Sequence, residues 1–505
     1  MRAMSTTARW RVVAATVFAV GCALRIGLVL ASQGGPAGNY GYDQGVYYTA
    51  ADALTFGRLP YRDFTLLHPP GVMLALTPFA VIGRLTTDHT GFIVANASFA
   101  VLGSLNAALV VAIARRAGLS LIAGAAGGLF YAVWYGAVSA EISARLEPLG
   151  SFAFLCGVLA LTTTGRSARR TLVLAGAALG LAVSVKMWWI VPVLVVLAWQ
   201  LRSADARRRV VPLVGGVLGA VLLVDGPFFL AAPHAMWRMV VSDQLGRNAS
   251  NTSPLVRLEE LSSLRSALAG VPTTVIAAAL LAGTVVAVVL GAAAWRVTTG
   301  RLFVLVAVSQ LVVLLLAPIY FSYYSGYLAA AAALVVAAAT HRVKAPQGIG
   351  RFGEATAAVA VTLVAALTAT AMLSRPIRIV QPFPTPAVAR GVAQARCVMA
   401  DSPLALIELN VLSRGLAAGC PNWVDVSGRT YDVDAPPPGR PVARAANAKW
   451  QRDLRNYLLS GDAEITIRAA TGYSPQTKKR LAGLPAIARF GGYVLREVPR
   501  ARTGY

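Results

Sequence analysis

Residues 12–31 read VVAATVFAVGCALRIGLVLA, which is long enough to cross a bilayer as a helix. Similar apolar bands recur along the chain with short polar connections between them. Of the 505 residues, 56% are hydrophobic and 13% are charged, whereas soluble proteins carry about 25% charged residues. Because so few charges cannot cover a water-exposed surface, a soluble enzyme is excluded. The pattern predicts a polytopic α-helical membrane protein with about eleven transmembrane helices, near 12–31, 91–114, 118–138, 149–165, 171–185, 187–201, 210–231, 271–294, 302–318, 326–340 and 355–374.

The distribution of basic residues predicts the orientation. The net charge of +25 comes from 46 Lys and Arg against 21 Asp and Glu. With eleven spans, the basic clusters all fall on one side, which the positive-inside rule makes cytoplasmic. Membrane topology therefore explains the charge, and no nucleic-acid partner is expected. The clusters before and between the spans are Arg2, Arg9 and Arg11; Arg115 and Arg116; Arg166, Arg169 and Arg170; Arg202 and Arg207–Arg209; Arg296 and Arg301; and Arg342, Lys344 and Arg351.

Residues 376–505 differ in composition from the rest of the chain, with Pro-rich patches and mixed charges. We expect residues 1–375 to form the transmembrane module and 376–505 to form a small extracytoplasmic α+β domain. Apolar and β-branched runs predict strands at Leu404–Leu409, Glu464–Arg468 and Tyr493–Glu497, and Arg444–Leu459 reads as a helix.

Four cysteines divide between the two parts of the chain. Cys22 and Cys156 lie in predicted spans and are expected to be small packing residues. Cys397 and Cys420 both lie in the predicted extracytoplasmic domain, where oxidation is allowed, so a disulfide between them is predicted.

The predicted outer loop at residues 32–90 is long and carries several polar motifs. It contains YGYDQGVYYTAAD at 40–52, GRLPYRD at 57–63 and HPPG at 68–71. Residues 44–56 place apolar and aromatic side chains at helical spacing, and residues 72–83 form a short apolar segment. Both suit helices that lie in the membrane interface.

These motifs resemble those of the GT-C superfamily of membrane glycosyltransferases, in particular the protein O-mannosyltransferases and the aminoarabinose transferase of lipid A. The matching features are Asp43 soon after the first span, Gly57–Tyr61, and His68–Pro70. The resemblance continues with Glu147-Pro148 and with a glycine-rich span that ends in Lys186. Gln44 departs from the pattern, because many relatives carry a second acidic residue there.

The resemblance implies an inverting transfer of a sugar from a polyprenyl-phosphate donor to a hydroxyl of an envelope glycan, glycolipid or protein. Asp43 is the expected general base, and an anionic leaving phosphate requires cations. Mannose and arabinose are the first sugars to test, in a bacterial plasma membrane. The expected phosphate-binding residues are Lys186, Arg62, Arg145 and Arg247; the expected substrate- or acceptor-binding residues are Glu147, His68, Tyr61, Tyr320 and Tyr324. No cofactor is assigned, and the use of a divalent cation is left open.

Two other functional classes fit a polytopic chain. A polyprenyl-lipid or polysaccharide transporter would keep ionisable residues inside its spans, where the sequence places little apart from Arg25. A non-catalytic envelope scaffold would use the basic tail to bind anionic polymer. Ten of the twelve acidic residues before position 376 fall on the predicted outer side, which favours the enzyme.

Overall fold

The computed structural model describes residues 5–31, 41–162, 168–202, 205–246, 252–268, 270–341, 363–368, 386–428, 444–467, 472–490 and 493–499. Arg247 and most of the predicted span 355–374 lie outside these residues. The contacts divide the chain into two units. The first contains Met1–Ser32, Ala97–Asp225 and Ala249–Arg378; the second contains Gln33–Asn96, Gly226–Asn248 and Ile379–Tyr505. The predicted boundary at 375 stays a prediction, because the contacts group the first loop with the C-terminal residues.

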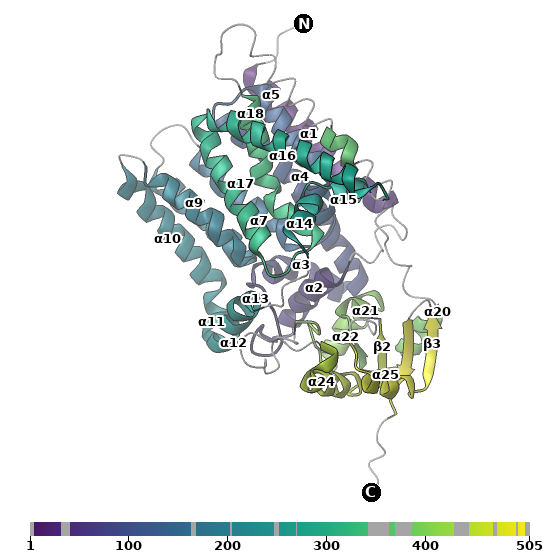
Figure 1. Cartoon of the computed structure of the whole chain (residues 1–505). Helices are drawn as coiled ribbons and strands as arrows, with labels where there is room; N and C mark the ends of the chain where they lie inside the picture. The colour runs from purple at the N-terminus through teal and green to yellow at the C-terminus, as the bar shows by residue number, and fades with distance from the viewer. Residues whose placement is uncertain are drawn as a thin grey trace. The chain divides into compact units, whose positions relative to one another are not determined.

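Long apolar helices make this chain a membrane protein (Figure 1). In the described part of the chain, five helices are long and apolar enough to cross a bilayer. They are α1 (Thr6–Ala31), α4 (Asp88–Arg116), α16 (Thr273–Trp295), α17 (Thr298–Leu316) and the segment Ser322–Thr340, which includes η4 (Ser322–Tyr324) and α18 (Ser325–Thr340). Shorter apolar helices are α3 (Gly71–Leu85), α7 (Leu146–Leu161) and Met187–Gln200, which joins η2 (Met187–Trp189) to α9 (Ile190–Gln200). The total of eleven spans stays a prediction.

Two predicted spans are broken. The span predicted at 118–138 consists of α5 (Leu121–Val133) and α6 (Tyr135–Glu141), which meet at an angle of 55°. The span predicted at 210–231 ends early, because α10 (Ala206–Val224) stops before Asp225 and α11 (Gly226–Ala231) follows it. Pro227 follows Gly226 and has no backbone N–H, so it cannot donate to the carbonyl oxygen of Leu223 as a continuous helix would require. Hydropathy alone did not reveal either break.

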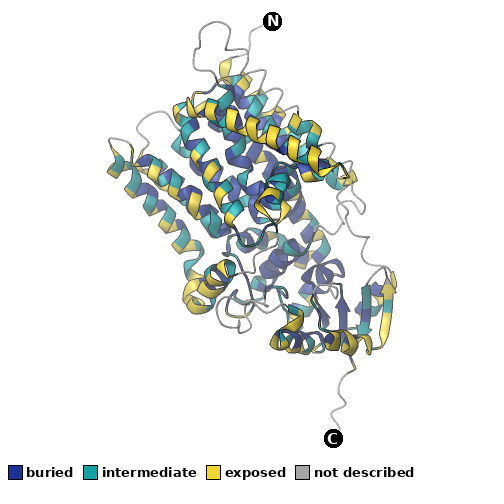
Figure 2. Ribbon diagram, viewed as in Figure 1, coloured by how far each residue is buried: buried dark blue, intermediate teal, exposed yellow. Residues whose placement is uncertain are grey.

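The surface of α16 faces away from the first unit's core, and Figure 2 shows its long exposed stripe. Only 6% of its apolar window is buried, and Leu281 and Val288 are 69% and 65% exposed. Such a surface is stable in contact with lipid tails rather than water.

The first unit packs helices closely through small residues. Its strongest packing joins α8 (Arg169–Val185) to α10. A Cβ on Gly176 would meet the carbonyl oxygen of Leu213, and one on Gly216 would meet that of Val173. Glycine at both positions therefore lets the two backbones touch, as is common between membrane helices. The short helices α14 (Pro254–Leu261) and α15 (Leu264–Ala267) precede α16.

The charge of Arg25 is neutralised inside the first unit. Its Nε donates to Glu141 Oε2 at 3.1 Å, and Tyr131 donates to Glu141 Oε1 at 2.5 Å. Both side chains of the ion pair are fully buried. A Cβ on Gly103 would clash with Glu141, so glycine makes room for the carboxylate. The ion pair therefore joins α1 to the bent α5–α6 segment.

The second unit begins with the helices of the first loop. The helices predicted at 44–56 and 72–83 are confirmed as α2 (Tyr42–Thr55) and α3; their placement in the membrane interface stays a prediction. The segment 226–248 adds α11, α12 (Pro233–Trp237), the π-helical turn η3 (Arg238–Ser242) and α13 (Asp243–Leu245). The C-terminal part adds α20 (Pro386–Ala393), α21 (Pro403–Glu408), α22 (Leu412–Ala417), η5 (Arg444–Ala446), α24 (Ala448–Leu458) and α25 (Pro475–Ala482).

The C-terminal part also contains a four-stranded sheet in the order β1-β2-β4-β3. The parallel pair is β1 (Val398–Ala400) and β2 (Ala463–Thr466), and β4 (Tyr493–Glu497) is antiparallel to β2 and to β3 (Ala486–Phe490). The strands predicted at 464–468 and 493–497 and the helix predicted at 444–459 are confirmed as β2, β4 and η5–α24. The strand predicted at 404–409 is wrong.

Residues 403–408 form α21 instead of a strand. Pro403 occupies the first turn after the N-cap Ser402, and proline at this position favours helix initiation. The whole segment is buried, so its continuous apolar run carries no period that separates strand from helix.

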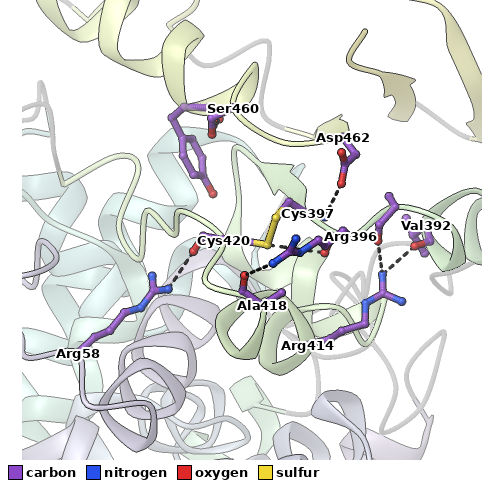
Figure 3. Close-up of a disulfide and its surroundings, with 11 residues drawn as sticks. Arg58, Val392, Arg396, Cys397, Arg414, Ala418, Cys420, Ser460 and Asp462 are labelled. Carbon is purple, nitrogen blue, oxygen red and sulfur yellow. Dashed lines mark hydrogen bonds between the residues drawn. A yellow bond between two sulfur atoms is a disulfide. The ribbon is translucent and has the colours of Figure 1, made fainter. Parts of the chain in front are cut away.

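Cys397 and Cys420 are joined by a disulfide (Figure 3). The Cys397 amide donates to Asp462 at 3.0 Å, and Arg58 donates to the Cys420 carbonyl oxygen at 2.9 Å. The bond therefore links β1 to the end of the α22 region, and Arg58 adds a contact from the first loop.

We predict that non-reducing peptide mass spectrometry detects a cross-link between Cys397 and Cys420. Replacing Cys397 by Ser should lower the free energy of unfolding of this region by about 3 kcal/mol, because the bond closes a loop of 23 residues' separation. Cys22→Ser is the control. It keeps the disulfide, so its free energy of unfolding should equal that of the wild type, and reduction should lower both by the same amount. Two free thiols in protein isolated without reductant would contradict the prediction.

A buried pair of carboxyl groups joins the first loop to α22 within the second unit. The Ser413 hydroxyl lies 2.8 Å from Asp52 Oδ2 and 2.5 Å from Asp88 Oδ1. A hydroxyl has a single proton to donate, so one carboxyl group must supply the other. The Ser413 amide also donates to Asp88, which favours the ionised form there. The proton therefore belongs to Asp52, and burial raises the pKa of Asp52 to about 7.

This arrangement predicts a pH-dependent stability. Because the pKa of Asp52 is raised from its ordinary value of 3.8 to about 7, the native state holds this proton more tightly than the unfolded state. The protonated Asp52 carboxyl group therefore contributes to the free energy of unfolding. This contribution is complete below pH ~4 and is lost as the pH rises through ~7. Thermal unfolding of the purified protein between pH 4.5 and 8 should show this slope.

Asp52→Asn should flatten the slope, because its amide group donates to Ser413 at every pH. Asp453→Asn makes the same chemical change on a half-buried carboxylate of α24 and should keep it. Equal slopes in the wild type and Asp52→Asn would contradict the assignment of the proton.

Candidate functional site

Lys186 lies at a break between two helices of the first unit. It ends α8 and precedes η2 with an extended backbone (φ −151°, ψ 123°). Its side chain is only 3% exposed, and its Nζ donates to Glu147 Oε1 at 2.8 Å. Glu147 occupies the first turn of α7, where the helix dipole favours a carboxylate. A buried ammonium needs such a partner, because desolvation of an isolated charge is costly.

Aromatic rings cover the same ammonium group. The Lys186 Nζ lies 4.0 Å from the ring centroids of both Trp188 and Tyr324. The two rings meet edge to face at 4.8 Å, and the electron-rich faces of such rings stabilise a cation. Lys186 is therefore held by one carboxylate and two rings from three separate segments.

Arg145 adds a second cation next to Glu147 in the chain. Its guanidinium carbon lies 3.9 Å from the ring centroid of Tyr323, which neighbours Tyr324 in η4. We call Arg145, Glu147, Lys186, Trp188, Tyr323 and Tyr324 the Lys186 cluster. Its two cations and one carboxylate leave a net positive charge, which suits an anionic ligand.

Tyr320 and Arg257 lie beside this cluster. The Tyr320 ring lies 6.1 Å from that of Tyr324. Arg257, in α14, donates to the carbonyl oxygens of Leu314 and Ala317 at 3.0 and 2.6 Å, and its guanidinium lies 5.6 Å from the Tyr320 ring. Among the described residues, the buried Tyr320 hydroxyl has no hydrogen-bond partner. A ligand could satisfy this hydroxyl, since buried polar groups are rarely left unpaired.

Asp43 lies in the first turn of α2, in the second unit, and is half-buried. The neighbouring Tyr42 hydroxyl donates to Asp425 at 2.9 Å and accepts the Ser427 amide at 2.9 Å. Gly41, which precedes the helix, has a positive φ of 123° that favours glycine. The start of α2, and with it the backbone of Asp43, is therefore fixed by contacts to 425–427.

Tyr61 and His68 are held together in the same unit. The Tyr61 hydroxyl donates to the His68 carbonyl oxygen at 2.7 Å, and its own backbone has a positive φ of 67°. The His68 imidazole packs edge to face on Tyr47 at 5.8 Å. Tyr47 is one helical turn after Asp43, so these two residues share a face of α2. His68 therefore lies on the side of α2 that carries Asp43.

The remaining two predicted phosphate-binding residues are Arg62, in the second unit, and Arg247. Arg62 is exposed and pairs with its neighbour Asp63 through hydrogen bonds of 2.9 and 2.8 Å. Arg247 lies outside the described residues. The five predicted residues of the first unit (Arg145, Glu147, Lys186, Tyr320 and Tyr324) do lie together.

Sequence reasoning did not identify Trp188 or Arg257 as site residues. The Trp188-Trp189 pair directly after Lys186 was a usable signal, because interfacial tryptophans often accompany cations. Nothing in the sequence distinguished Arg257 from the other arginines. In the described part of the chain, no group of three or more His, Cys, Asp or Glu side chains could hold a metal ion.

No family model matches the chain, and a search of the curated proteins finds no match. Among solved structures, ArnT from Cupriavidus metallidurans bound to undecaprenyl phosphate is similar at 15% identity and a TM-score of 0.59, over 99% of this chain and 100% of that chain. Its apo structure gives a TM-score of 0.58 at 15% identity, over 98% and 99%. The oligosaccharyltransferase AglB from Archaeoglobus fulgidus, in complex with an inhibitory peptide and a dolichol-phosphate, gives 0.50 at 12%, over 90% and 69%.

We predict a strong energetic coupling between Lys186 and Glu147. Glu147→Gln should lower the free energy of unfolding by about 3–5 kcal/mol, because it leaves the buried ammonium without its counter-charge. Adding Lys186→Met should recover much of this loss. The measurement is a double-mutant cycle by thermal unfolding in one detergent.

The matched control is the more exposed pair Arg265–Glu259, whose nitrogen and oxygen lie 3.1 Å apart. Removing either partner there should cost less than about 1 kcal/mol. A Lys186–Glu147 coupling no larger than that of the control pair would contradict the burial of this ion pair.

Proposed function

We propose, from the premise that the chain has the GT-C fold, that it transfers a sugar from a polyprenyl-phosphate carrier to an acceptor hydroxyl. The observation that carries this proposal is the likeness over nearly the whole length of both chains to ArnT, which was solved bound to undecaprenyl phosphate. The Lys186 cluster supplies the electrostatics that such a carrier needs. Mannose and arabinose remain the sugars to test first.

The proposed leaving group is the carrier phosphate. Its negative charge grows as the bond between the anomeric carbon and the phosphate oxygen breaks, so cations close to that oxygen stabilise the transition state. Arg145 and Lys186 are the proposed cations. In the absence of carrier, the Glu147 carboxylate compensates the positive charge of Lys186. We assign to Glu147 the role of holding the Lys186 side chain in place.

The proposed base is Asp43. As the acceptor oxygen attacks the anomeric carbon, its proton must leave, and a carboxylate within hydrogen-bond reach accepts it. Attack from the face opposite the phosphate inverts the anomeric centre, and the carrier leaves as polyprenyl phosphate. No covalent intermediate is needed. His68 and Tyr61 are proposed to shape the acceptor side of Asp43, because both lie near the start of α2.

The proposed substrate contacts in the first unit are aromatic. Tyr320 has a buried hydroxyl that a carrier or sugar oxygen would satisfy. Tyr324 already packs against the Lys186 ammonium, so it would contact a phosphate bound there. The acceptor itself, whether envelope glycan, glycolipid or protein, is left to the assay.

Asp43→Asn should lower transfer by a factor of about 10²–10⁴, as expected for the loss of a positioned general base. The assay follows radiolabelled sugar from undecaprenyl phosphate–mannose or –arabinose into an envelope extract, with the protein in nanodiscs. Undecaprenyl phosphate affinity, titrated separately, should stay unchanged, because this substitution leaves the proposed phosphate-binding cations, Arg145 and Lys186, intact.

Asp453→Asn is the control for the loss of a carboxylate in the same unit and should transfer at the wild-type rate. Turnover of Asp43→Asn within a factor of about three of wild type would remove Asp43 from the mechanism. Failure of the wild-type protein to bind undecaprenyl phosphate would overturn the function itself.

A further inference from the structure

A cavity of about 370 Å³ lies at the opposite end of α9 from Lys186, entirely within the first unit. It is formed where α7 and α9 end and where α10 and α17 begin. Arg202, Arg209 and Arg301 contribute its cationic lining. These connections fall on the side that the positive-inside rule makes cytoplasmic. The apolar lining is Val158, Leu161, Val196, Leu302 and Phe303.

The cationic side chains are held in place by neutral partners. Arg209 Nε donates to the Oε1 of the buried Gln200 at 3.0 Å, and Arg301 Nε donates to the Trp295 carbonyl oxygen at 3.0 Å. The Arg202 guanidinium lies 4.6 Å from the Trp199 ring centroid. Within the described ranges, none of these three arginines forms an ion pair with a carboxylate. Three positive charges around one cavity repel each other, and an anion would relieve that repulsion.

Two further donors line the cavity. Thr298 and Thr299 begin α17, where free backbone N–H groups and the helix dipole favour an anion. In the described part of the chain, the buried Thr299 hydroxyl has no hydrogen-bond partner. The helix start and the hydroxyl therefore add uncharged hydrogen-bond donors to the three arginines, which supply the positive charge.

The cavity also borders lipid-facing surface. Leu201, between the lining residues Gln200 and Arg202, is 61% exposed, and Leu305, one turn after the lining residue Arg301, is 36% exposed, as expected for residues in contact with lipid tails. A ligand with a phosphate group and attached acyl chains would match both the arginines and the apolar lining. Basic pockets between membrane helices on the cytoplasmic side bind anionic lipid headgroups for this reason.

We propose that this cavity is a binding site for the phosphate of an anionic phospholipid, separate from the proposed transfer site. Arg202, Arg209 and Arg301 bind the phosphate oxygens, and Thr299 donates a further hydrogen bond. The guanidinium fork matches phosphate geometry better than an ammonium group does. The site recognises a structural lipid of the membrane and takes no part in sugar transfer.

The test titrates the full-length protein in detergent with dioleoyl phosphatidylglycerol and follows bound lipid by native mass spectrometry. Arg209→Gln and Arg301→Gln should each weaken binding about tenfold or more, because each loses a charge-assisted hydrogen bond. Dioleoyl phosphatidylcholine should bind much more weakly than phosphatidylglycerol. Inorganic phosphate should compete only at far higher concentrations than the lipid.

Arg296→Gln is the matched control, because this exposed arginine lies in the same α16–α17 connection and is not part of the cavity lining. Arg202→Gln is a second variant in case the other two unfold, because the wild-type Arg202 side chain makes no hydrogen bond among the described residues. Thermal unfolding without lipid identifies such a failure.

Three results would overturn the proposal. Equal loss of lipid in Arg296→Gln would mean that positive charge at this end suffices without the cavity. Loss only in variants of Arg169, Arg207 and Arg208, which line a second hollow of about 560 Å³ between α8 and α10, would place the lipid there. Competition by phosphate at lipid-like concentrations would mean that the site takes a soluble anion.

Discussion

Removing a charged group from water costs more free energy than most contacts can return, unless a partner is buried with it. This constraint accounts for the polar interior of the first unit. Arg25 reaches Glu141, Lys186 reaches Glu147, and Arg257 meets backbone carbonyl oxygens near the end of α17. Each contact joins residues at least 39 positions apart in the sequence. The apolar residues supply most of the packing area, but these contacts fix which helix ends must meet, because each charge accepts few partners.

The same constraint indicates which polar groups of the first loop serve to hold the structure together. The Tyr61 hydroxyl and the His68 carbonyl oxygen satisfy each other, and the Tyr42 hydroxyl satisfies Asp425 and Ser427. These contacts use up polar groups that could otherwise serve a substrate, so they are best understood as the support for α2. Asp43 lies in the first turn of that helix, so the role of base proposed for it would depend on this support being rigid.

Sequence patterns predicted features that are local and missed those that depend on long-range pairing. Helical spacing was sufficient to predict α2 and α24, and apolar and β-branched runs were sufficient for β2 and β4. The grouping of Lys186, Glu147 and Tyr324 followed from shared motifs and topology. By contrast, Glu141 became visible only as the partner of Arg25, and Arg257 only through its contacts with the end of α17. The helix α21 was mistaken for a strand because every residue in it is buried, which removes the periodicity that separates the two.

The arginines at the predicted cytoplasmic end show where a topological explanation is incomplete. The positive-inside rule requires basic residues in these connections but is indifferent to their geometry. Arg296 satisfies the rule while exposed to solvent. Arg209 and Arg301 satisfy it equally well, yet their side chains are held by Gln200 and the Trp295 carbonyl oxygen around a common cavity. Topology therefore explains why these charges are present, and it leaves their convergence to be explained by a bound anion.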